Sequence, residues 1–224
     1  MTLFDVVGPV MVGPSSSHTA GAVRIGYIAG KLLGEKIKKA QINLYGSFFA
    51  TGRGHGTDRA LMAGLLGFRP DDERIPSSFA LAAEQGIDFK FGEAMLREGH
   101  PNSAQIILDG IYGTHIEVIG ESIGGGRINI SHLDGQQAGF SGEYPTLIVY
   151  NLDQPGRVAE VTAMLAGRGI NIVSMHLQRS NRGGNAVMVI ECDQEVPVGI
   201  CTWFEGHPGI EKVKYLNPEE YSNV

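Results

Sequence analysis

The last third of the sequence restricts the fold most, because its patterns follow one another in a fixed order. Four apolar, β-prone runs predict strands: Thr146–Tyr150, Ile170–Leu177, Ala186–Ile190 and Val213–Leu216. Apolar residues at helical spacing predict a helix over 158–165, ended by Gly167 and Gly169, and a second short helix is expected over 198–204. Asn181–Gly184 predicts a hairpin turn between the second and third strands. The resulting order, βαββαβ, is the ferredoxin-like arrangement.

A polar, glycine-rich segment at Asp134–Glu143 precedes this pattern and predicts a domain boundary. We therefore expect a first domain at residues 1–142, a second at residues 145–224, and an α+β fold overall. In the first domain, apolar periodicity predicts a helix over 22–33, and Thr57 or Asp58 is expected to cap another helix that runs to 66. Strands are expected at Ile42–Leu44, 105–108, 115–119 and 127–131, with a turn at Gly124–Gly126.

Composition excludes several classes of function. The formal net charge of -6 argues against a nucleic-acid partner, whose phosphates demand a basic surface. No apolar run approaches the roughly 18 residues of a membrane span, and Met1–Asp5 shows no secretory signal, so a cytoplasmic location is expected. Cys192 and Cys201 are too few to ligate a cubane cluster and have no metal-type spacing, so no metal site is expected in this chain.

Three consecutive serines directly before the first predicted helix form the first candidate site. Ser15, Ser16 and Ser17 are followed by His18 and Thr19. One helix cap needs one hydroxyl, and here several hydroxyls share a helix N-terminus, whose dipole and free N–H groups attract a carboxylate or phosphate. Plain capping of the helix is the alternative interpretation.

The segment Tyr45–Asp58 forms the second candidate site, and we expect it to be a loop. Its four glycines bracket Arg53 and His55 and would let the backbone approach a ligand closely. His55 would lie just before a helix N-terminus, where the helix dipole favours the neutral, basic ring. The glycine spacing matches neither a dinucleotide fingerprint nor a P-loop. A flexible loop with a solvated histidine is the alternative.

Two further segments carry weaker signals. Asn102, after Pro101, is suited either to hydrogen-bond a ligand carboxylate or to cap a turn. The polar residues of Asn151–Gly156, together with Gly169–Ile172, are suited to hold a small amino acid, although an ordinary βα turn explains them equally.

At this point the sequence resembles a known family. Gly13–Gly21 and Thr51–Asp58 closely resemble the motifs of bacterial iron–sulfur L-serine dehydratases, and Asp153–Gly156 with Gly169–Ile172 resembles the ACT domain, a small-molecule sensor of βαββαβ fold. The resemblance covers nearly the whole chain. It implies a dehydratase beta domain, related to the allosteric substrate-binding domain of some phosphoglycerate dehydrogenases, followed by an ACT domain.

The resemblance also implies an activity. The chain would be the beta subunit of a two-chain lyase that converts L-serine to pyruvate and ammonia, with the [4Fe–4S] cluster ligated by a separate Cys-rich alpha subunit. His55 would be the base, and His18 with the neighbouring hydroxyls would hold the substrate carboxylate or stabilise charge. Which histidine is the base stays open. The implied substrate-binding residues are Ser15, Ser16, Ser17, Thr19 and Asn102, and the implied effector-binding residues of the ACT domain are Asn151, Asp153, Gly156, Asn171 and Ile172.

Two alternatives remain at this stage. One is a purely allosteric, amino-acid-sensing subunit with no catalytic residue, and the other is an amino-acid-binding protein without a cluster-bearing partner. The implied ACT domain also predicts association between beta chains, through the ACT domain or the first domain, because its sheets often pair edge to edge.

Overall fold

The computed structural model describes residues 9–218, and these residues fall into two compact units that divide between Gly135 and Gln136. Met1–Asp5, on which the expectation about a secretory signal depends, lie outside the described residues. The domain limits predicted from the sequence, 1–142 and 145–224, stay a prediction. No helix among residues 9–218 is both long enough and apolar enough to cross a membrane.

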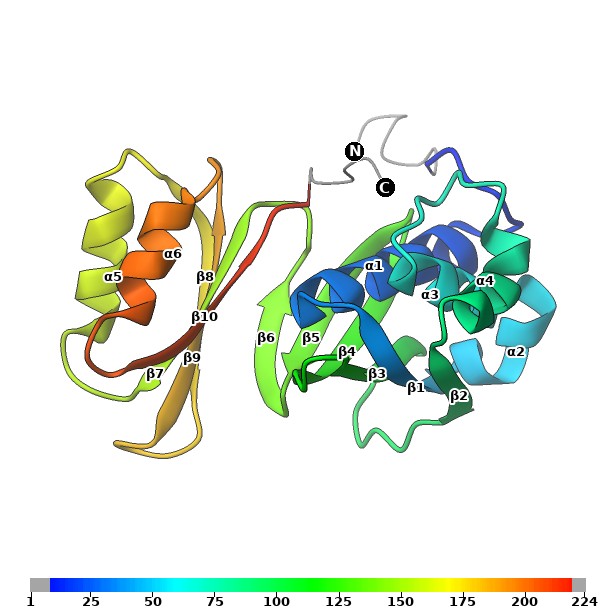
Figure 1. Cartoon of the computed structure of the whole chain (residues 1–224), viewed down its shortest axis with the longest axis horizontal. Helices are drawn as coiled ribbons and strands as arrows, with labels where there is room; N and C mark the ends of the chain where they lie inside the picture. Colours follow the sequence, from blue (N-terminus) through cyan, green and yellow to red (C-terminus); the bar gives the residue numbers. More distant parts are fainter. Residues whose placement is uncertain (1–8, 219–224) are drawn as a thin grey trace. The chain divides into compact units, whose positions relative to one another are not determined.

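The sheet of the first unit has the strand order β2-β1-β3-β4-β5, in which β1 and β2 are parallel and the other neighbouring pairs are antiparallel. Buried and partly exposed residues alternate along β3 and β4, as expected when helices cover one face of a sheet. Figure 1 shows the helices of this unit gathered on that side. In chain order the elements are the π-helix η2 (Ser16–Gly21), α1 (Ala22–Leu33), β1 (Ile37–Gly46), α2 (Ser47–His55), α3 (Thr57–Leu65), the 3-10 helix η3 (Ile75–Ser77), α4 (Ser78–Glu84), β2 (Asp88–Glu93), β3 (Asn102–Gly110), β4 (His115–Gly124) and β5 (Arg127–Leu133). Strand β6 (Gln136–Phe140) begins directly after the division between the units.

Helices α1 and α3 pack so closely that a side chain at the contact would collide with the backbone of the other helix. A Cβ atom added to Gly26 would lie 2.1 Å from the carbonyl oxygen of Leu61, and one added to Gly64 would lie 2.0 Å from that of Val23. One added to Gly30, a turn after Gly26, would lie 3.3 Å from the carbonyl oxygen of Leu65, a turn after Leu61. The two helices therefore run in the same direction, and their N-terminal ends lie at the same end of the pair.

The structure corrects two predictions for this unit. The segment expected to be a loop contains helix α2, and neither Thr57 nor Asp58 caps α3, because the residue before the helix is Gly56 in the left-handed conformation, with no side-chain cap. The helix over 22–33, the four strands and the turn at Gly124–Gly126 are confirmed. The sequence analysis did not anticipate η2, α4, β2 or β6.

The second unit contains the predicted βαββαβ order: β7 (Thr146–Leu152), α5 (Arg157–Ala166), β8 (Ile172–Arg179), β9 (Asn185–Cys192), α6 (Val198–Glu205) and β10 (Ile210–Leu216). Its antiparallel sheet has the order β10-β7-β9-β8, so the first strand is central. Leu147 and Met188 of the sheet share one buried core with Leu165 of α5 and Phe204 of α6. This arrangement confirms the ferredoxin-like fold and the α+β class.

The close helix contact makes a stability prediction. We expect Gly64→Ala to lower the free energy of unfolding by about 2–3 kcal/mol, because the added methyl group must push apart two backbones that cannot yield locally. Gly54→Ala, inside α2, is the control: a Cβ atom there meets nothing within 4 Å, so stability should stay the same or rise by up to about 1 kcal/mol. Urea unfolding followed by circular dichroism measures both, and equal effects would contradict the packing argument.

Candidate active site

Two histidines from the two candidate segments meet where the N-terminal ends of α1 and α3 lie together. His18 lies in η2, which continues into α1, and His55 is the last residue of α2, immediately before Gly56 and α3. Their ring centroids are 4.9 Å apart and the ring planes are inclined at 45°. The parallel packing of α1 and α3 thus brings together residues that are 37 positions apart in the sequence.

The serine-rich segment both caps its helix and lines this end of the helix pair. The Oγ atom of Ser15 accepts the backbone N–H of His18 at 3.1 Å, so one of the three serines does act as a cap. Ser16 and Ser17 are half-buried in η2. Thr19 is 2% exposed, and its hydroxyl has no hydrogen-bond partner within the described part of the chain. Single π-helical turns of this kind occur frequently at functional sites.

His18 is held by two hydroxyl groups from α2. Its Nε2 atom lies 3.1 Å from the Oγ atom of Ser47 and 3.2 Å from the Oγ1 atom of Thr51. The ring also contacts Phe48 edge-on, with centroids 5.2 Å apart. Burial lowers the pKa of His18, the neighbouring His55 lowers this pKa further, and a backbone interaction with Ser47 opposes both effects. His18 is therefore neutral at pH 7, with one ring nitrogen available as a proton acceptor.

His55 is exposed, and its Nδ1 atom lies 3.1 Å from the backbone carbonyl oxygen of Thr51. The sequence argument considered only the helix that follows His55. In the structure His55 also ends α2, and the dipole at a helix C-terminus acts in the opposite direction from that at an N-terminus. His55 thus lies between the C-terminal end of α2 and the N-terminal end of α3.

Asn102 lies beside the start of α2. It is the first residue of β3 and is paired in register with Gly46, the residue before α2. Its backbone N–H donates to Nδ1 of His100 at 3.2 Å, and the carbonyl oxygen of Pro101 accepts the N–H of Phe48 at 3.3 Å. The structure thus places Asn102 near the helix that carries Ser47 and Thr51, at the edge of the same site.

Sequence reasoning missed Ser47, Thr51 and Thr57. Ser47 and Thr51 contact His18, and the fully buried hydroxyl of Thr57, at the start of α3, has no hydrogen-bond partner among residues 9–218. The spacing of Ser47, Thr51 and His55, each four residues after the last, is the signal that could have identified Ser47 and Thr51. That spacing places three residues on one face only if the segment is helical.

The predicted effector residues of the second unit do not gather at one point. Asp153 follows β7 and accepts hydrogen bonds from the backbone N–H of Gly183 and from Arg179, which hold the pKa of its carboxyl group below the usual range. Asn171 precedes β8, and its side chain donates to Asp193 at 2.6 Å. Leu152, before Asp153, pairs with Asn185, and Ile172, after Asn171, pairs with Cys192, so the two residues lie beyond strand positions that are seven residues, about 23 Å, apart along β9. One small effector therefore cannot touch both within one chain.

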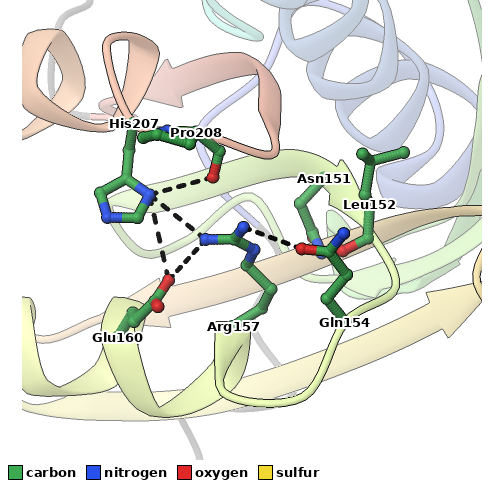
Figure 2. Close-up of polar contacts among 7 residues, drawn as sticks. All are labelled: Asn151, Leu152, Gln154, Arg157, Glu160, His207 and Pro208. Atoms are coloured by element: carbon green, nitrogen blue, oxygen red, sulfur yellow. Dashed lines mark hydrogen bonds and ion pairs between the residues drawn. The ribbon is translucent and has the colours of Figure 1, made fainter.

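Asn151 lies in a polar cluster at the start of α5, shown in Figure 2, and Gly156 is the residue directly before that helix. Arg157 donates to Glu160 at 2.7 Å and to Gln154 at 3.0 Å, and its Nη1 atom lies 3.2 Å from Nδ1 of His207. Asn151 is 2% exposed, and its Oδ1 atom has no hydrogen-bond partner in the described residues. Ile172, the first residue of β8, lies instead at the Asn171 end of the sheet.

The donor set of the described residues does not fit an iron–sulfur cluster. Residues 9–218 contain no group of three or more His, Cys, Asp or Glu side chains arranged to hold a metal ion. Cys192 belongs to the core of the second unit, where burial raises the pKa of its thiol to about 11, and burial also raises the pKa of Cys201. Neither thiol is prepared to act as the thiolate that ligates iron.

Comparison of the sequence with known protein families identifies the family of this chain. The sequence model described as serine dehydratase beta chain matches residues 2–132, and that of the ACT domain matches residues 146–200. The chain belongs to the serine dehydratase beta chain family. This family member is 42% identical over 212 residues to a probable L-serine dehydratase beta chain of Bacillus subtilis (strain 168), covering 95% of this chain and 96% of that one.

A second relative of similar length is the L-serine dehydratase beta chain of Peptoniphilus asaccharolyticus, which is 38% identical over 214 residues, 95% of this chain and 96% of the relative. The D-3-phosphoglycerate dehydrogenase of Methanocaldococcus jannaschii is 33% identical over 116 residues, which cover 47% of this chain and 22% of that enzyme. The similarity to the two beta chains thus extends over both units.

The histidine contact predicts a coupled titration. We expect the pKa of His18 to lie below its ordinary value of 6.5, and His55→Gln to raise this pKa while leaving it below 6.5, because burial is the larger cause. Since the unfolded chain binds this proton more readily, His18 lowers stability as the pH falls through and below 6.5. Histidine NMR titration measures the pKa, with His115→Gln as the control. A His18 titration that does not change in His55→Gln would contradict the contact.

Proposed function

We propose that this chain is the beta subunit of a two-chain iron–sulfur L-serine dehydratase, which converts L-serine to pyruvate and ammonia. In this proposal the chain supplies substrate-binding and proton-transfer residues, and a Cys-rich alpha subunit carries the [4Fe–4S] cluster. The observation that carries the proposal is the pair His18–His55, which joins the two family-specific segments at 4.9 Å. The full-length similarity to L-serine dehydratase beta chains supports it.

The chemistry of the reaction needs the groups found here. Conversion of serine begins with removal of the Cα proton and loss of the β-hydroxyl group as water, and hydrolysis of the resulting imine then gives pyruvate and ammonia. A neutral histidine suits removal of the Cα proton near pH 7. The substrate carboxylate needs an anion site, and the adjacent N-terminal ends of η2–α1 and α3 supply two helix dipoles beside Ser16, Ser17 and Thr19. Asn102, at the edge of the site, is proposed as a further substrate contact.

The two histidines differ in accessibility, and this difference suggests their roles. His55 is exposed and is therefore placed to reach a substrate bound on a partner subunit, so we assign it as the base. His18 is half-buried and held by two hydroxyls, which suits orientation of the substrate or stabilisation of developing charge. Because the donor set of residues 9–218 does not fit the cluster, no step through the cluster is assigned to them.

The second unit is proposed to regulate the enzyme. The polar cluster around Asn151 and Gly156 at the start of α5 is the part of the predicted effector site that carries an unpartnered buried acceptor. Because Asn171 and Ile172 lie at the other end of the sheet, an effector that contacts both ends would need two chains. We therefore propose that beta chains associate, through the ACT domain or the first domain.

Co-expression tests the function. This chain and a Cys-rich alpha chain, purified together without oxygen, should form pyruvate from L-serine, and neither chain alone should do so. His55→Gln should reduce kcat by about 10²–10⁴-fold, the usual contribution of a general base. His18→Gln should also reduce activity, whereas His115→Gln, on an exposed histidine of β4, should behave as the wild type. Full kcat in His55→Gln at saturating serine would instead favour a purely allosteric subunit.

A further inference from the structure

One residue of α2, Thr51, contacts both histidines of the candidate site through two different atoms. Its side-chain Oγ1 lies 3.2 Å from Nε2 of His18, and its backbone carbonyl oxygen lies 3.1 Å from Nδ1 of His55. Both contacts are within hydrogen-bond range. They allow the position of the proton on each ring to be deduced, because a histidine ring nitrogen is either a donor or an acceptor and each partner limits which.

The proton of the Thr51 hydroxyl has a nearer acceptor than the ring of His18. This hydroxyl donates to the backbone carbonyl oxygen of Ser47, one helical turn earlier, at 2.9 Å. A hydroxyl has one proton, so towards His18 the Oγ1 atom of Thr51 can only accept. With the Thr51 proton in the bond to Ser47, the ring proton of His18 is assigned to Nε2, and its Nδ1 atom, for which no side-chain hydrogen bond is found among residues 9–218, has a free lone pair.

The carbonyl oxygen of Thr51 fixes His55 in the opposite sense. A carbonyl oxygen is only an acceptor, so Nδ1 of His55 must donate to it, and Nε2 of His55 is left with the lone pair. The carbonyl group has two lone pairs and can accept this bond in addition to a helical N–H. Thr51 thus determines that the two bare nitrogens are Nδ1 of His18 and Nε2 of His55.

We propose that Thr51 is a positioning residue that fixes the tautomers of both histidines, and so determines which ring nitrogens can accept a proton. The tautomer assignment stands on the geometry of this chain alone. Its catalytic consequence rests on the proposed function, since a base is useful only if its lone pair points at the substrate proton. Ser47 does not share this role, because its Oγ atom, 3.1 Å from Nε2 of His18, is able to donate or to accept.

Three variants separate the roles of the two hydroxyls. Thr51→Val keeps the shape of the side chain and removes the acceptor, which leaves the Ser47 hydroxyl free to donate to Nε2 and so moves the His18 proton to Nδ1. Thr51→Ser keeps the hydroxyl and should retain the wild-type tautomer. Ser47→Ala should retain it as well, because Thr51 still accepts from Nε2. His55 should stay protonated on Nδ1 in all three variants, because the carbonyl oxygen of residue 51 remains.

Long-range 1H–15N spectra of the full chain with 15N-labelled histidine distinguish N–H from bare ring nitrogens and test the assignment without any enzymatic activity. The expected wild-type result, above the pKa of both rings, is a proton on Nε2 of His18 and on Nδ1 of His55. A wild-type His18 protonated on Nδ1, or the same His18 tautomer in Thr51→Val as in the wild type, would overturn the proposal. Circular dichroism checks that each variant is folded. If Thr51→Val does not fold, the 1H–15N spectrum of the wild type alone decides the tautomer assignment.

The catalytic consequence is tested in the complex with the alpha chain. Thr51→Val should lower kcat at least about tenfold, with a smaller change in KM for L-serine, and Thr51→Ser should restore kcat to within about threefold of the wild type. Equal losses in Thr51→Val and Thr51→Ser would overturn the positioning role. A wild-type complex that forms no pyruvate would instead contradict the proposed function, and the tautomer assignment from the spectra would be unaffected.

Discussion

The close packing of α1 on α3 is the constraint on which the candidate site depends. Gly26 and Gly64 let the two backbones meet where any side chain would collide with a carbonyl group of the other helix. Because the helices are parallel, this contact also aligns their first turns, and the residues just before them, His18 and His55, become neighbours. The glycines therefore determine the geometry of the site without contacting it, because the distance between the histidines is a consequence of helix packing.

Helix α2 is a poor helix by intrinsic propensity, and its surroundings explain why it forms. Glycine inside a helix costs about 1 kcal/mol relative to alanine, and α2 contains Gly52 and Gly54. Against this, Phe48 is fully buried, and Gly46 and Gly56 take positive φ angles at the two ends. Two of the four glycines that suggested a loop are thus terminators of a helix. A Cβ atom at Gly52 would lie 3.2 Å from that of Thr57, so this glycine allows close packing on α3.

The sequence was sufficient to predict elements defined by their own periodicity, such as α1 and the βαββαβ order of the second unit. It was insufficient where tertiary contacts override local preference. Because of its glycines, α2 was predicted to be a loop. The contacts of Ser47 and Thr51 with His18, which depend on the helix, were therefore not predicted. In the second unit, Asp153 and Asn171 were predicted to share one effector site because both lie at turns. The strand register, which no local sequence pattern reveals, places them at opposite ends of β9.

Both histidines are oriented by contacts with one short helix, α2, and this limits the local stability of the site. A nine-residue helix with two internal glycines has little stability of its own, so it belongs to the part of a protein that opens locally before the whole chain unfolds. When α2 frays, the hydroxyl and the carbonyl group of Thr51 leave their partners together. The hydrogen bonds that orient the two histidine rings would then be lost in a single event.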